Sequence, residues 1–222
     1  MRLLVAGLAV GFSVIPFLIA GAPVESQLGV MQKIFYFHVP CAWLLLGSTG
    51  AAAAGSLLFL FRGSTRGDRL ALASVELGVL FGACTLVTGS LYARVAWGVF
   101  WTWDARLTSS LLLWLMLVAY LLARRYGGPG ASRLAAALAL FAAADAPLVY
   151  VSVNVWRTIH PTTTVIPTLE PLMARVFWAS TVMFCGLWGV LAVLRVRLER
   201  ARAALEALEA TGPDPAHPPR PG

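Results

Sequence analysis

The feature that most constrains the fold of this chain is a series of six long apolar runs. They cover roughly residues 3–20, 39–61, 73–93, 107–123, 132–152 and 173–194. A membrane-spanning helix needs about 20 mostly apolar residues. Hydrophobic residues make up 59% of the chain and charged residues 12%, whereas a soluble domain is nearer about 45–50% and about 25%. The sequence therefore predicts an all-α integral membrane protein with six transmembrane helices in contact with the lipid bilayer.

The segments between the runs alternate in charge, and this alternation predicts their sidedness. Residues 62–69 and 124–133 are rich in arginine, whereas 21–38, 94–106 and 153–172 are aromatic with few charges. With the amino terminus inside, 12 of the 17 lysines and arginines lie on the inner side, as the positive-inside rule requires. Both termini are thus expected in the cytoplasm and the aromatic loops outside. Topology also accounts for the net charge of +7, so no nucleic-acid partner is expected.

The loop at residues 94–108, between the third and fourth runs, concentrates aromatic side chains. It holds Trp97, Trp101 and Trp103, together with Gly98, Phe100 and Asp104. Tryptophan favours both membrane interfaces, so an aromatic belt without a ligand is one interpretation. The one-sided placement instead favours a platform for a large flat amphiphile. If residues 97–104 were helical, Trp97, Trp101 and Asp104 would share one face.

Two histidines lie on the same predicted outer face as this loop. His38 is followed closely by Pro40, which can begin a helix, and His160 follows the fifth run. Neutral imidazole is a common iron ligand, and two imidazoles can bind one haem iron axially. Basic side chains nearby could pair with carboxylates such as haem propionates, or could simply anchor lipid headgroups; they are Lys33, Arg106 and Arg157.

Other polar features in the runs have more than one interpretation. Ionisable residues inside a membrane are rare and suggest a function by default. Glu76 lies close to an inner end and could face the interface, whereas Asp145 lies deeper and could serve helix packing or the site. From Arg195 onward a charged helix is expected to about residue 209. A proline-rich tail to residue 222 follows, whose composition is typical of disorder.

Three motifs in order resemble those of the haem exporter protein C (CcmC) family, a group of tryptophan-rich (WWD) haem-handling proteins of cytochrome c maturation. They are Phe37-His38-Val39-Pro40, then Trp103-Asp104-Ala105-Arg106-Leu107-Thr108, and finally Trp156-Arg157-Thr158-Ile159-His160. The resemblance implies that His38 and His160 are axial ligands to haem iron. It also implies a haem platform formed by Trp97, Gly98, Phe100, Trp101, Trp103, Asp104 and Trp156.

The resemblance further implies a role in the cell. Haem b would be bound transiently on the periplasmic face of the bacterial inner membrane and presented to the chaperone CcmE. The expected neighbours are the small membrane protein CcmD and the ABC-transporter pair CcmA and CcmB. On this interpretation the chain is an assembly factor rather than an enzyme. Lys33 and Val155 stand where the family pattern favours an arginine and an aromatic residue, which weakens those two contacts.

Two other classes of function are compatible with the residues. A cytochrome b-type redox subunit would also carry paired histidines, although such pairs usually lie within facing spans; reversible electron transfer from a quinol would favour it. A transporter of haem or a small solute would be expected to contain broken helices near the membrane midplane. Haem accumulation in proteoliposomes containing only this chain would favour the transporter.

Overall fold

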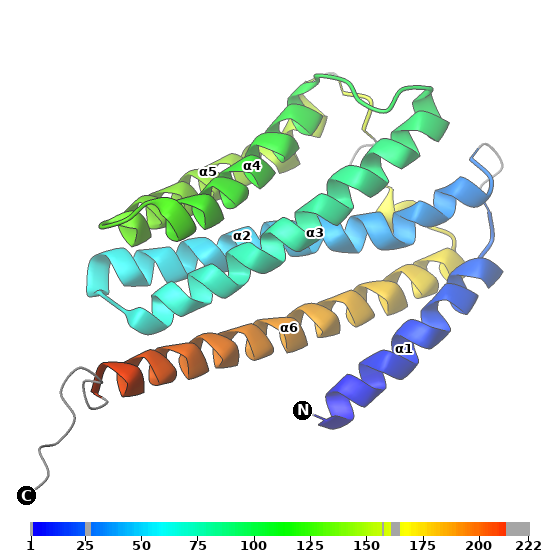
Figure 1. Cartoon of the computed structure of the whole chain (residues 1–222). Helices are drawn as coiled ribbons and strands as arrows, with labels where there is room; N and C mark the ends of the chain where they lie inside the picture. The colour runs from blue at the N-terminus through cyan, green and yellow to red at the C-terminus, as the bar shows by residue number, and fades with distance from the viewer. Residues whose placement is uncertain (1, 25–27, 157, 161–164, 212–222) are drawn as a thin grey trace, which may run out of the picture.

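The protein is an all-helical bundle in a computed structural model, which describes residues 2–24, 28–156, 158–160 and 165–211. The long helices are α1 (Arg2–Gly21), α2 (Phe35–Arg62), α3 (Thr65–Trp97), α4 (Ala105–Tyr126), α5 (Ala131–Val155) and α6 (Pro171–Thr211) (Figure 1). Two short 3₁₀ helices, η1 (Val30–Ile34) and η2 (Ile166–Thr168), precede α2 and α6. In the described part of the chain, six helices are long and apolar enough to cross a membrane. This confirms the predicted all-helical fold with six helices long enough to span a membrane.

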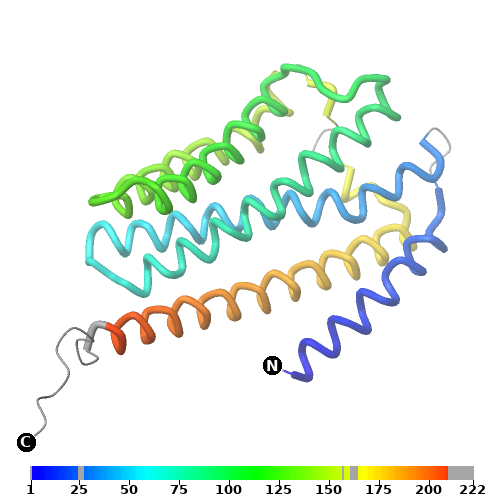
Figure 2. The backbone as a smooth tube through the Cα atoms, viewed as in Figure 1, coloured from blue at the N-terminus to red at the C-terminus, as the bar shows by residue number. Residues whose placement is uncertain are grey.

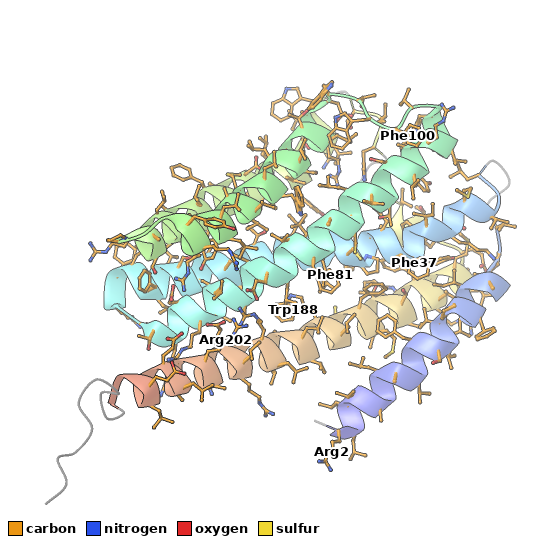
Figure 3. The ribbon with its side chains drawn as sticks, viewed as in Figure 1. Arg2, Phe37, Phe81, Phe100, Trp188 and Arg202 are labelled. Carbon is orange, nitrogen blue, oxygen red and sulfur yellow. The ribbon has the colours of Figure 1, made fainter. Side chains whose placement is uncertain are left out.

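The helices pack as a central pair with neighbours on both sides. α2 and α3 run antiparallel in the middle, the α4–α5 hairpin packs on one side, and α6 and α1 lie on the other (Figures 1 and 2). Figure 2 shows the carboxyl ends of α1, α3 and α5 at the same end of the bundle as the amino ends of α2, α4 and α6. We call this the aromatic end, because the tryptophan-rich loop lies there. Phe81 and Trp188 fill the space between α3 and α6 (Figure 3).

Helix α2 begins earlier than the sequence suggested, and Pro40 lies inside it rather than at its start. Proline has no N–H, so the carbonyl four residues before it loses its helical partner. That carbonyl belongs to Tyr36, and the Ser180 hydroxyl of α6 donates a hydrogen bond to it at 2.6 Å. The prediction that Pro40 begins the helix is therefore wrong, because an interhelical hydrogen bond compensates for the missing donor.

The segment between α3 and α4 is shorter than predicted and is not helical. Gly98 has a φ of 76°, a left-handed conformation that ends helices readily only at glycine. Asp104 then caps α4, accepting a hydrogen bond from the Leu107 N–H at 2.9 Å. The condition for a common face over 97–104, a helical segment, is therefore not met: Trp97 ends one helix and Asp104 caps the next.

Helix α6 joins two predicted elements, the last span and the charged helix. Its 41 residues extend about 60 Å, twice the hydrocarbon thickness of about 30 Å. Arg195 on α6 pairs with Glu76 on α3, with Nη2 donating to Oε1 at 2.7 Å. Glu76 thus has a packing role. Asp145 on α5 keeps one buried carboxylate oxygen, Oδ2, without a partner among the described residues.

Candidate functional site

A cavity of about 310 Å³ lies at the aromatic end of the bundle. Four helices form its walls: the beginnings of α2 and α4 and the ends of α3 and α5, joined by Ile159, His160, Val165 and Ile166. Most side chains that line it are apolar or aromatic. Among them are Phe35, Trp43, Tyr92, Trp97, Trp101 and Tyr150. Ligand sites in proteins are typically apolar hollows of this size with a few polar groups.

Two imidazoles face this cavity from separate parts of the chain. His38 lies in the first turn of α2, and His160 follows α5. Their ring centroids are 6.5 Å apart and their planes are inclined by 39°. The sequence placed both histidines on one face of the membrane, and the structure brings them to one cavity.

The tryptophans of the predicted platform divide into two groups. Trp97 and Trp101 line the cavity. Trp103 is 78% exposed, and it lies outside the cavity lining, as do Phe100 and Trp156. Figure 3 shows Phe100 beside the end of α3. We call these three residues, Phe100, Trp103 and Trp156, the aromatic rim.

Trp101 differs from two tryptophans elsewhere in the bundle. Its Nε1 atom is buried without a hydrogen-bond partner among the described residues. Trp114 donates to the Val79 carbonyl at 2.9 Å, and Trp188 donates to the Ser48 hydroxyl at 2.7 Å. Buried N–H groups are nearly always paired, because leaving one unpaired costs about 1–3 kcal/mol. Trp101, which lines the cavity, thus carries a buried donor that none of the described residues satisfies.

Asp104 ties the loop to the segment that carries His160. Its Oδ2 atom accepts hydrogen bonds from the Thr102 and Thr158 hydroxyls at 3.0 and 2.9 Å. The Ile159 N–H also points to this oxygen, at 3.4 Å. Burial by itself raises the pKa of Asp104. The hydrogen bonds named here, together with the one from Leu107, lower it by more, so the pKa of Asp104 is below its ordinary value. Asp104 does not line the cavity.

The three predicted cations fall in different places. Arg106 lines the cavity and donates to the Val149 carbonyl at 2.9 Å. No carboxylate of the described residues forms an ion pair with it. Lys33 lies outside the cavity lining and donates to the Ala20 carbonyl at 2.5 Å. Arg157 lies outside the described residues.

Sequence reasoning missed the aromatic side chains that the helices themselves contribute. Phe35 and Trp43 lie on α2, on either side of His38, and Tyr150 lies on α5. The spacing from Phe35 through Val39 to Trp43 repeats every four residues and places them on one helix face. This pattern could have indicated that α2 contributes a wall of the site.

These features define the class of protein: a helical protein with six membrane-capable helices, whose aromatic-lined cavity at one end of the bundle carries two imidazoles. A family model described as CcmC, Heme exporter protein C, matches residues 1–211. The chain belongs to this family.

Individual relatives agree with this assignment. The chain is 40% identical over 141 residues to Heme exporter protein C of Bradyrhizobium diazoefficiens, a match that covers 63% of this chain and 54% of that protein. It is 31% identical over 183 residues to Heme exporter protein C of Escherichia coli K12, a match that covers 79% of this chain and 73% of that protein. A putative cytochrome c biosynthesis ccmC-like mitochondrial protein of Arabidopsis thaliana is 36% identical over 139 residues. This match covers 63% of this chain and 53% of that protein. The matched region thus spans about half the length of the first and third of these relatives.

Proposed function

We propose that this chain binds haem b transiently between His38 and His160 and presents it for cytochrome c maturation. The separation of the two imidazoles carries the proposal. Because a metal–imidazole bond is about 2 Å long, two imidazoles that ligate one ion from opposite sides have ring centroids roughly 6 Å apart. The centroids of His38 and His160 are 6.5 Å apart. The separation of the two rings is therefore close to that expected for imidazoles that share one iron ion.

The chemistry of the donor set also fits haem rather than a bare metal ion. In the described residues there is no group of three or more His, Cys, Asp or Glu side chains that could hold a metal ion. Two imidazoles alone leave most coordination positions of a metal empty. Haem supplies the remaining ligands in its macrocycle, with two axial positions for histidine.

The polar groups in the cavity complement carboxylates. Arg106 is a cation in a mostly apolar hollow, and among the described residues its guanidinium donates to the Val149 carbonyl. The Trp101 N–H is a second donor, and it has no acceptor within the part of the chain that the structure describes. A charge-assisted bond to a ligand carboxylate would satisfy either group. We assign Arg106 to a haem propionate and treat Lys33 and Arg157 as weaker candidates. The aromatic walls, with Trp97 and Trp101, support the macrocycle.

The aromatic rim is suited to transfer rather than to holding the ligand. Trp103 is exposed at the cavity end of the bundle, as are Phe100 and Trp156. We propose that the rim meets a CcmE-like chaperone, and that a CcmD-like protein and a CcmA/CcmB pair stand beside the chain. The site would face the periplasm of the bacterial inner membrane with both termini in the cytoplasm, because the arginine-rich connections lie at the opposite end of the bundle. This role needs no bond-making step in this chain.

The location of the cavity favours a protein that presents haem to a partner over a transporter or a cytochrome b-type redox subunit. A transporter binds its substrate near the midplane, and a redox subunit holds haem between facing spans. Here the walls come from helix ends at one end of the bundle. A ligand at that position is accessible to a partner outside the membrane.

Co-expression with a CcmE-like chaperone tests the proposal, with covalent haem on the chaperone as the readout. We expect Trp101→Ala to reduce both the haem held by this chain and the haem transferred. Trp103→Ala should leave the haem content intact but reduce transfer. Trp188→Phe is the matched control, because Trp188 packs between helices and should change neither quantity. Normal transfer in both Trp101→Ala and His38→Ala would contradict the proposal.

A further inference from the structure

Two neighbouring residues of α3, Thr88 and Gly89, contact the ring of His38 on α2. The Thr88 hydroxyl oxygen lies 3.0 Å from His38 Nδ1, and a Cβ atom on Gly89 would lie 2.9 Å from His38 Cε1. We propose that Thr88 and Gly89 are positioning residues that fix the tautomer and the place of the His38 imidazole. The inference rests on the proposed function, in which His38 ligates haem iron.

The hydrogen bonds of Thr88 determine where the imidazole proton sits. A threonine hydroxyl has one hydrogen to donate and lone pairs to accept with. The Thr88 hydroxyl donates that hydrogen to the Cys84 carbonyl at 2.6 Å. A hydroxyl that donates to the Cys84 carbonyl accepts from His38, and in this arrangement the ring proton lies on Nδ1. The lone pair of the neutral ring is then on Nε2, which is the atom left to bind a metal.

This arrangement has the form of a metal site's outer shell. A ligating histidine usually donates its other ring N–H to an oxygen, which fixes the tautomer and the ring orientation. Here the oxygen belongs to a hydroxyl whose own orientation is fixed by the backbone of α3. In this arrangement the proton position on His38 is set before any ligand arrives.

Gly89 determines how closely the ring can approach α3. An added Cβ would lie 2.9 Å from Cε1, 3.5 Å from Nδ1 and 3.8 Å from Nε2 of His38. Any side chain at this position would push the imidazole away from the helix. The absence of a side chain at Gly89 therefore allows the ring to reach the Thr88 hydroxyl.

A purely structural role for Thr88 is the competing explanation. Threonines in helices often donate to the carbonyl four residues earlier, as Thr49 does to Leu45 at 2.9 Å. Thr88 makes the same backbone bond but also contacts a ring nitrogen. Thr49→Val is therefore the matched control, because it removes a buried hydroxyl that donates to a backbone carbonyl.

The first measurement uses the full-length protein without haem. With ¹⁵N-labelled histidine in lipid nanodiscs, the His38 signals are assigned by their loss in His38→Ala. We expect wild-type His38 to be a single tautomer protonated on Nδ1. Thr88→Val should give a mixture of tautomers, Thr88→Ser should restore the single form, and Thr49→Val should leave it unchanged. Protonation on Nε2 in the wild type would overturn the proposal.

The second measurement is a haem titration of the same proteins. Loss of an outer-shell partner typically weakens metal binding about 10–100-fold, and we expect this for Thr88→Val, with recovery in Thr88→Ser. Gly89→Ala should also weaken binding and shift the absorption spectrum, whereas Gly47→Ala should not, because nothing lies within 4 Å of a Cβ there. Thr88→Ala removes the same hydroxyl should Thr88→Val not accumulate.

The results separate this inference from the proposed function. If His38→Ala binds haem as the wild type does, the ligand assignment itself is wrong. If His38→Ala loses haem but Thr88→Val keeps both the wild-type tautomer and the wild-type affinity, only the positioning role is wrong.

Discussion

Asp104 connects the tryptophan-rich loop, the start of α4 and the segment that holds His160. The sequence suggested that this carboxylate was part of the haem platform. In the structure its oxygens accept hydrogen bonds from the loop, from the first turn of α4 and from the segment before His160, and it does not line the cavity. We therefore infer that Asp104 acts on the ligand through His160 rather than by contact.

The helix cap of Asp104 can be separated from its link to His160. Asp104→Ala should lower the free energy of unfolding by about 1 kcal/mol through the lost cap, and should also weaken haem binding. Ser64→Ala is the control, because Ser64 caps α3 by accepting from the Gly67 N–H at 3.1 Å, at the other end of the bundle. Thermal unfolding and haem titration measure the two effects. Equal haem affinity in the two variants would contradict the link to His160.

The lowered pKa of Asp104 also predicts a pH dependence. A carboxyl whose pKa is lower in the folded state stabilises the fold at pH values above its unfolded pKa, about 3.9. This contribution is lost as the pH falls through the folded-state pKa. The stability difference between the wild type and Asp104→Asn should thus shrink as the pH is lowered from 6 toward roughly 3. Thermal midpoints in detergent measure it, and a difference independent of pH would contradict the assignment.

The α2–α3 pair sets the position of His38, because the imidazole on α2 is held by residues of α3. The two helices approach closely where Gly55 faces Gly67. A Cβ on Gly55 would lie 2.5 Å from the Gly67 carbonyl oxygen and 2.8 Å from the Ala71 nitrogen. Small residues at helix contacts are typical of membrane bundles, since they allow the backbones to approach.

Gly55→Ala should therefore separate α2 from α3. We expect a loss of about 1–3 kcal/mol from overpacking, which a thermal unfolding curve in nanodiscs would show. Gly50→Ala on the same helix is the matched control, because nothing lies within 4 Å of a Cβ there. In a helix interior, alanine is more favourable than glycine by roughly 1 kcal/mol. The Gly50→Ala control should therefore be neutral or stabilising. Equal stability of the two variants would argue against close packing at Gly55.

For the whole molecule, hydrophobic run length was enough to predict six helices, because the bilayer imposes that length. Motif order was enough to group His38, His160 and the tryptophan loop. The division between lining and rim was not predictable: Trp101 and Trp103 are two residues apart, yet only Trp101 lines the cavity. The role of Thr88 was also beyond the sequence, because it depends on a contact between residues 50 positions apart.

The central claim is that His38 and His160 together hold one haem iron. The most direct test is the electron paramagnetic resonance and absorption spectrum of haem in the purified full-length protein. We predict one low-spin haem with two imidazole ligands in the wild type and in His217→Ala, which alters the third histidine of the chain. His38→Ala and His160→Ala should each lose the haem or lose the two-imidazole spectrum. Wild-type haem content and spectrum in both of these variants would contradict the account.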